Sequence, residues 1–211
     1  MSKSETNVKF RNFLSFGIIG PLVVIPLTLL DVYLSPWFSW SSNALSDLGV
    51  HPYSYLFNGG LIFEAVSNFI FAIALRKLDL TSSGTAAALA VAGISLGFVG
   101  IFNENHPPFH LIFALIYFIV FPIAIIAFSA GSRAIGGYSR AVGYLCAIIG
   151  LVFIVVGIVQ DFNVISTPFG LGVYELVEAI MLSIWTVYTG AFYLSHGVKT
   201  NMNKRSQDEK S

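Results

Sequence analysis

Six apolar runs, each about as long as a lipid bilayer is thick, dominate this sequence of 211 residues. A helix needs about 20 mostly apolar residues to cross the hydrocarbon layer. With 55% hydrophobic and 10% charged residues, the composition excludes an ordinary soluble domain. The sequence therefore predicts an all-α polytopic membrane protein that forms one transmembrane domain over residues 1–211. The six expected helices cover Phe13–Leu34, Tyr55–Leu75, Thr85–Phe102, Phe109–Ala130, Tyr138–Gln160 and Leu171–Leu194.

Positive charge is distributed unevenly over the segments that connect these runs. All eleven Lys and Arg residues share one side of the six-helix topology. By the positive-inside rule that side is cytoplasmic. This predicts cytoplasmic tails at residues 1–11 and 196–211, and a location in the cell membrane. The eleven cations are Lys3, Lys9, Arg11, Arg76, Lys77, Arg133, Arg140, Lys199, Lys204, Arg205 and Lys210.

The opposite side carries acids and histidines and no cation. Seven of the eleven carboxylates and three of the four histidines fall there, in or beside connections such as the outer loop at 35–54. A nucleic acid finds no basic patch to bind outside the tails, so membrane lipids are the expected partners. The ten residues are Asp31, Asp47, Glu64, Glu104, Asp161, Glu175, Glu178, His51, His106 and His110.

The topology pairs the six helices into three hairpins, and each hairpin has an acid at its outer end. The interval from Asp47 to Glu64 recurs later in the chain. It separates Asp161 from Glu178, while Glu104 falls midway between the two aspartates. A three-hairpin pseudo-repeat is one interpretation, and chance alignment of apolar helices is the other. In a true repeat the two glutamates would face a common centre, where membrane transporters place their sites.

Small residues recur along one face of the third run. Gly93, Gly97 and Gly100 are spaced so that another helix can approach closely. The face predicts tight packing against a neighbouring helix, or an interface in a homo-oligomer or with a membrane partner.

The segment Asn43–Gly49 has the sequence Asn-Ala-Leu-Ser-Asp-Leu-Gly and is predicted to form a short interfacial helix that ends at Gly49. Leu-Phe-Asn-Gly-Gly-Leu-Ile follows at 56–62, and Asn-Glu-Asn-His-Pro-Pro-Phe-His occurs at 103–110. With the six-span layout, these motifs resemble the DUF998 family of integral membrane proteins over nearly the whole chain. The chain is also distantly similar to the six-span Frag1/DRAM group. The resemblance implies a fold and no activity.

The three outer histidines provide the first candidate site. His106 and His110 flank two prolines at the start of the fourth run. Together with His51 and either Asp47 or Asp161, they would complete a set of three histidines and one carboxylate that suits a divalent metal such as zinc. The alternative is that these histidines cap helices and contact lipid headgroups.

Ser46 adds a hydroxyl group beside Asp47. Three histidines, an aspartate and a serine are the residue types of membrane hydrolases of the ceramidase and progestin-receptor type, although their order along the chain differs here. In that interpretation a metal-bound water is the nucleophile, and Asp47 or Asp161 is the general base or the fourth ligand.

Two glutamates inside the predicted spans provide the second candidate site. Glu64 and Glu178 lie about two turns, or roughly 10 Å, inside their runs, and neither run contains Lys or Arg. Asn68 is one turn beyond Glu64, and Glu175 is one turn before Glu178. One interpretation is a neutral carboxyl that joins helices by hydrogen bonds to Asn68, Tyr174 or the backbone. The other is a pocket for a proton or a cation that opens outward.

Three functions therefore stay open. The first is a metal-dependent hydrolase or transferase that acts on lipid. The second is a small ion- or proton-coupled transporter centred on Glu64 and Glu178. The third is a non-catalytic scaffold or partner subunit. Clustering of the outer acids and histidines in one pocket would favour the first two functions, and dispersal around the rim would favour the third.

Overall fold

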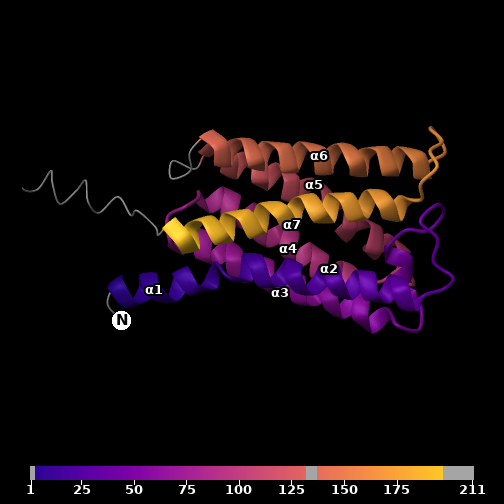
Figure 1. Cartoon of the computed structure of the whole chain (residues 1–211), viewed down its shortest axis with the longest axis horizontal. Helices are drawn as coiled ribbons and strands as arrows, with labels where there is room; N and C mark the ends of the chain where they lie inside the picture. Colours follow the sequence, from indigo (N-terminus) through magenta and orange to yellow (C-terminus); the bar gives the residue numbers. More distant parts are fainter. Residues whose placement is uncertain (1–2, 132–136, 197–211) are drawn as a thin grey trace, which may run out of the picture.

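The structure, a computed structural model, describes residues 3–131 and 137–196, with side chains from Val8 onward. Within these ranges it is helical, without strands (Figure 1). Arg133 and the four cations of the predicted C-terminal tail lie outside the described residues. The helices are α1 (Lys3–Phe13), α2 (Phe16–Leu34), α3 (Ser54–Lys77), α4 (Ser83–Ile101), α5 (Pro107–Gly131), α6 (Gly137–Asp161) and α7 (Leu171–His196), with a short 3₁₀ helix, η1, at Ser46–Val50.

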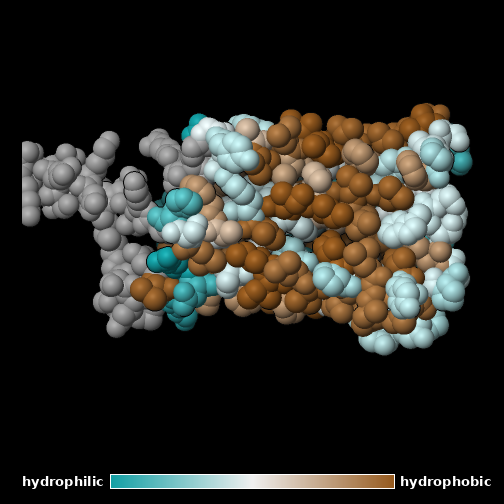
Figure 2. All heavy atoms as spheres, in the orientation of Figure 1, coloured by the Kyte–Doolittle hydropathy of each residue, from teal (hydrophilic) through white to brown (hydrophobic). Residues whose placement is uncertain are grey.

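Six of these helices are long and apolar enough to cross a membrane, which confirms the predicted fold class. Helices α2 to α7 follow the six predicted runs, with ends that differ by a few residues. The first span, Val8–Leu34, also includes part of α1, which covers most of the predicted N-terminal tail. On the face shown in Figure 2, hydrophobic residues form a broad band across the middle, between more hydrophilic ends.

The six long helices form a closed ring in chain order. Each helix from α2 to α6 packs against the next one in the sequence, and α7 packs against both α6 and α2 (Figure 1). One end of the ring carries Asp47, Glu104 and Asp161 and is called the acidic end below. The other end carries Arg76 and Lys77 and is called the basic end. Which end faces the outside stays a prediction from the positive-inside rule.

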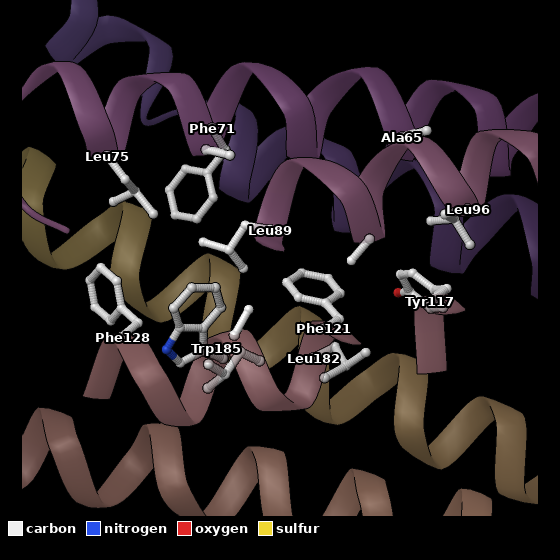
Figure 3. Packing of buried hydrophobic residues seen from close by; sticks show 14 of the residues in the cluster. Ala65, Phe71, Leu75, Leu89, Leu96, Tyr117, Phe121, Phe128, Leu182 and Trp185 are labelled. Carbon is white, nitrogen blue, oxygen red and sulfur yellow. The ribbon is translucent and has the colours of Figure 1, made fainter. Parts of the chain in front are cut away.

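A tryptophan on α7 organises the core toward the basic end. The Trp185 ring lies 5.3 Å from that of Phe128, 6.1 Å from that of Phe71 and 6.3 Å from that of Phe121, in edge-to-face arrangements (Figure 3). Aromatic pairs in this geometry stabilise beyond their buried area. The cluster joins α3, α5 and α7 across the ring.

The small-residue face of α4 packs against α3, as predicted for a neighbouring helix. A Cβ atom placed on Gly97 would lie 3.0 Å from the Cβ of Ala65, and one on Gly100 would lie 2.7 Å from the carbonyl oxygen of Asn58. The backbones approach so closely that the described structure leaves no room for larger side chains at these positions.

The outer loop contains a short helix, as predicted, but its bounds differ: the 3₁₀ helix η1 covers Ser46–Val50 and not Asn43–Gly49. One Asp47 oxygen accepts hydrogen bonds from the Asn43 amide, at 2.7 Å, and from the backbone N–H of Ala44, at 3.1 Å. These hydrogen bonds from Asp47 back to the preceding residues hold residues 43–45 outside the helix.

Substitution of Gly100 by Ala tests the packing of α4 on α3. We expect Gly100→Ala to destabilise the protein by about 1–3 kcal/mol, because the new methyl group overpacks against a backbone carbonyl. Gly59→Ala is the matched control, since a Cβ at Gly59 would meet nothing within 4 Å. Thermal unfolding in detergent measures both variants, and equal melting temperatures for the two would contradict the close approach.

Candidate functional site

Residues 43–50, called the plug below, fold into the acidic end of the ring and are tied to α7. The backbone N–H of Leu45 donates to Glu175 Oε2 at 2.6 Å, and the N–H of Gly172 donates to the Asn43 carbonyl at 2.8 Å. A Cβ on Gly172 would lie 2.9 Å from that carbonyl oxygen, so the approach requires glycine. The buried Glu175 carboxylate therefore serves as an acceptor for the backbone of the plug.

Two further elements hold the plug in place. The Gly49 carbonyl accepts from the side-chain amides of Asn58 on α3, at 2.9 Å, and Asn103 before α5, at 3.0 Å. The Ser46 hydroxyl donates to Glu104 Oε1 at 2.5 Å. The plug is thus hydrogen-bonded to parts of all three hairpins.

On the outer side of the plug is a polar cavity of about 670 Å³. Asp47, Glu104 and Asp161 line it, together with Gln160 and Thr167. Three of the predicted site residues therefore share one cavity. No Lys or Arg occurs at 12–75, 78–132 or 141–198, so no described Lys or Arg side chain belongs to the segments that line this cavity.

Glu104 connects the outer cavity with the plug. Burial raises the pKa of the Glu104 carboxyl, the hydrogen bond from Ser46 lowers it, and the nearby Asp47 carboxyl raises it. Ser46 itself lines a second cavity on the inner side of the plug.

This inner cavity has a volume of about 80 Å³ and lies within the ring. Glu64, Glu175, His110 and Tyr117 line it, and most of the other lining residues are apolar. The predicted polar residues Glu64 of α3 and Glu175 of α7 therefore share one cavity, and the predicted His110 joins them.

Glu64 is the carboxyl group of this cavity that has free acceptor capacity. Its side chain is 5% exposed, and Oε1 accepts a hydrogen bond from Asn68 at 3.0 Å, which confirms the predicted contact. Oε2 has no hydrogen-bond partner among the described residues. It lies so close to Gly20 on α2 that a Cβ there would collide with it.

Glu178 is fully buried on α7 and packs against Gly150 of α6. Neither of its carboxyl oxygens has a hydrogen-bond partner in the part of the chain that the structure describes. Tyr117 of α5 lines the inner cavity together with Glu64, whereas Glu178 does not.

A family model described as "Protein of unknown function (DUF998)" matches residues 18–191. The chain belongs to the DUF998 family. The match covers the plug, both cavities and nearly all of the six spans, and it confirms the resemblance predicted from the sequence. No curated protein and no solved structure matches the chain.

The three histidines of this DUF998 chain are not brought together. His51 stacks on Trp37, with ring centroids 3.7 Å apart, and His106 is exposed beside Phe102. His110 Nδ1 donates to the Phe102 carbonyl at 2.9 Å. Among the described residues, no group of three or more His, Cys, Asp or Glu side chains is placed to hold a metal ion. The predicted three-histidine set therefore lacks the convergence that a tetrahedral site needs.

Two buried polar residues of the DUF998 fold were not among the predicted site residues. Tyr117 is an isolated polar residue in the middle of the apolar fourth run and gives little signal in a hydropathy pattern. Thr28 of α2 also lines the inner cavity. The sequence does contain a signal for Thr28, because Asp31 follows it by almost one helical turn in the same apolar run. In the structure both side chains are buried.

The position of Glu104 predicts a specific pH dependence. As pH rises above the ordinary value of 4.5, the unfolded carboxyl ionises before the folded one, so ionisation of Glu104 lowers folding stability in that window. Glu104→Gln removes this loss. We expect the melting temperature of Glu104→Gln, relative to that of wild type, to rise with pH. The rise should be about 2–4 °C if ionisation of Glu104 costs the folded wild type ~1 kcal/mol.

Thermal unfolding in detergent between acidic and neutral pH measures the effect. Asp79→Asn is the control, because Asp79 is an exposed acid that pairs with Arg76 at the basic end. A difference between Glu104→Gln and wild type that stays constant with pH would contradict the argument.

Proposed function

We propose that this multi-pass membrane protein is a small transporter that couples a cation to protons, with Glu64 and Glu178 as the exchanging groups. The observation that carries the proposal is the pair of buried carboxyl groups with three oxygens unpartnered among the described residues. An ionised carboxylate without a partner costs several kcal/mol or more in a membrane interior. Such a group is stable when it holds a proton or binds a cation, and exchange between the two states is the chemistry of a coupled carrier.

The acids also form a series that leads inward from the acidic end. Asp47 and Glu104 line the outer cavity. The plug binds Glu104 through Ser46 and Glu175 through the backbone of Leu45. Glu175 and Glu64 line the inner cavity. Carboxyl groups in series are the usual proton relays of pumps and transporters, so this order supports a proton route from the outer cavity to the inner one.

A metal-dependent lipid hydrolase has less support. It would need His51, His106 and His110 at one ion, whereas His51 stacks on Trp37 and His110 binds a backbone carbonyl. No contact of the described residues favours the scaffold function specifically. We place the protein in the cell membrane with the acidic end outside, following the positive-inside rule.

Proton counterflux in proteoliposomes tests the transporter directly. Liposomes that contain a pH-sensitive dye are given inward gradients of Na⁺, K⁺ or tetramethylammonium. We expect proton release in at least one case, reduced about tenfold or more in Glu64→Gln/Glu178→Gln, because glutamine holds no exchangeable charge at the membrane centre. Reconstitution in both orientations makes the assay independent of topology.

Asp79→Asn is the matched control, since it removes an acid at the basic end. Its counterflux should equal that of wild type. Counterflux no greater than in protein-free liposomes, or full counterflux in the double variant, would contradict the proposed function.

A further inference from the structure

We infer that the backbone of α2 holds the proton of the neutral Glu64 carboxyl group. In this arrangement Glu64 Oε2 carries the proton and donates it to the main-chain carbonyl of Gly17, which Pro21 leaves without its usual donor. Gly20 and Pro21 are then positioning residues for the exchanging group. The inference rests on the proposed function, because it names what holds the proton that a cation displaces.

The two carboxyl oxygens of Glu64 have different surroundings. Oε1 accepts a hydrogen bond from the side-chain amide of Asn68 at 3.0 Å, which assigns it as the carbonyl oxygen of a neutral carboxyl group. No donor among the described residues reaches Oε2. Since a protonated oxygen needs an acceptor and not a donor, Oε2 is the oxygen that carries the proton.

Glu64 Oε2 lies against the backbone of α2, in the place that a side chain on Gly20 would occupy. A Cβ atom built there would collide with Oε2 and would lie 2.8 Å from the Cβ of Ser67. The Cα–Cβ bonds of a helix tilt toward its N-terminus, and hydroxyl groups in this position bond to carbonyl oxygens three or four residues earlier. The main-chain acceptors on that side are therefore the carbonyls of Gly17 and Phe16.

One of these two carbonyls lacks its usual partner. Pro21 lies inside α2 and has no N–H, so it cannot donate to the carbonyl four residues earlier, which is that of Gly17. The N–H of Gly20 remains available for the Phe16 carbonyl. Gly17, Gly20 and Pro21 are buried. A buried carbonyl without a donor costs free energy, and lipid supplies no donor.

Two hydrogen-bond acceptors, Glu64 Oε2 and the Gly17 carbonyl, are therefore held together, and a proton between them satisfies both. It also leaves the pair uncharged in a part of the chain, residues 12–75, that contains no Lys or Arg. Packing holds α2 in place, because a Cβ on Gly17 would lie 2.8 Å from the Phe71 ring of α3 and 3.0 Å from the Thr186 carbonyl oxygen of α7.

Loss of the proton turns the contact with α2 from attraction to repulsion. An ionised Oε2 and a carbonyl oxygen are both acceptors, so the carboxylate moves away from Gly20. Glu64 also lines the inner cavity, beside the titratable groups Glu175, His110 and Tyr117, and this is the side to which the carboxylate turns. The proton thus decides whether the carboxyl group faces α2 or the cavity.

Infrared spectroscopy of the full chain in lipid vesicles at neutral pH tests the inference. For each protein, the spectrum of the same protein with Glu64→Gln is subtracted, which isolates the Glu64 carboxyl band. The C=O band of a neutral carboxyl group moves to higher frequency when the group loses a hydrogen bond. We expect this shift in Pro21→Ala, because the new N–H at position 21 bonds to the Gly17 carbonyl in place of Glu64.

Pro26→Ala is the matched control. Pro26 also lies inside α2, but the carbonyl four residues before it belongs to Leu22, which is exposed. The contact of Glu64 with Gly20 does not involve Pro26. The Glu64 band of this variant should therefore stay at the wild-type frequency.

Gly20→Ala tests the same contact through packing. The new methyl group takes the place of Glu64 Oε2, so the carboxyl group has to leave the Gly17 carbonyl and its band should also shift to higher frequency. This variant keeps the test decisive if Pro21→Ala fails to fold. Gly59→Ala is its control, since a Cβ at Gly59 would meet nothing within 4 Å.

An unshifted band in Pro21→Ala and Gly20→Ala, or an equal shift in Pro26→Ala, would overturn the inference and leave the transport function intact. Absence of a Glu64 carboxyl band from the wild type would overturn both. The expected shifts without any proton counterflux in proteoliposomes would support the inference and contradict the transport function.

Discussion

The absence of water from the bilayer interior is the constraint on which this structure depends. Every polar atom inside the ring has to find a partner within the protein, because lipid offers none. The bundle meets this demand at most positions, as with Asn68 on Glu64 and the Ser67 hydroxyl on the Phe63 carbonyl. Among the described residues, four of the unpartnered buried oxygens belong to carboxyl groups, those of Asp31, Glu64 and Glu178. The proposed function rests on the last two of these groups.

The plug gives the acidic end its organisation. It lies between an outer cavity lined by Asp47 and an inner cavity lined by Glu64, and Glu104 and Ser46 are bonded to each other across that boundary. The hydrogen bonds that hold the plug come from Glu175 and Glu104, two members of the acid series. Protonation of these acceptors would weaken the hydrogen bonds that hold the plug, and the proposed carrier needs a link of this kind between its proton sites and its access route.

Much of the fold follows from the sequence, because length and hydropathy determine each span locally. Helix bounds differ from the predicted runs by a few residues, and the Gly97 face and the Asn68 contact follow from helical spacing alone. Which helices lie next to one another does not follow from the sequence in the same way. Closure of the ring by α7 on α2 brings together segments far apart in the chain, and no periodicity encodes it.

The sequence predicts those features of the candidate site that depend on a single run, and it misses those that depend on contacts between segments. The deep position of Glu64 is a property of one run, so the sequence alone singles it out. The stacking of His51 on Trp37 depends on how the outer loop folds back. The sequence therefore does not reveal that His51 lies apart from His106 and His110. Tyr117 is missed because its role comes from its neighbours on α3 and α7.

The central claim is that Glu64 holds a proton in the empty protein and releases it when a cation binds. Infrared difference spectroscopy of the protein in lipid vesicles at neutral pH observes this group directly. The account predicts a protonated-carboxyl C=O band that shifts in heavy water, weakens when a bound cation is added and is lost in Glu64→Gln. A spectrum in that region that Glu64→Gln leaves unchanged would contradict it.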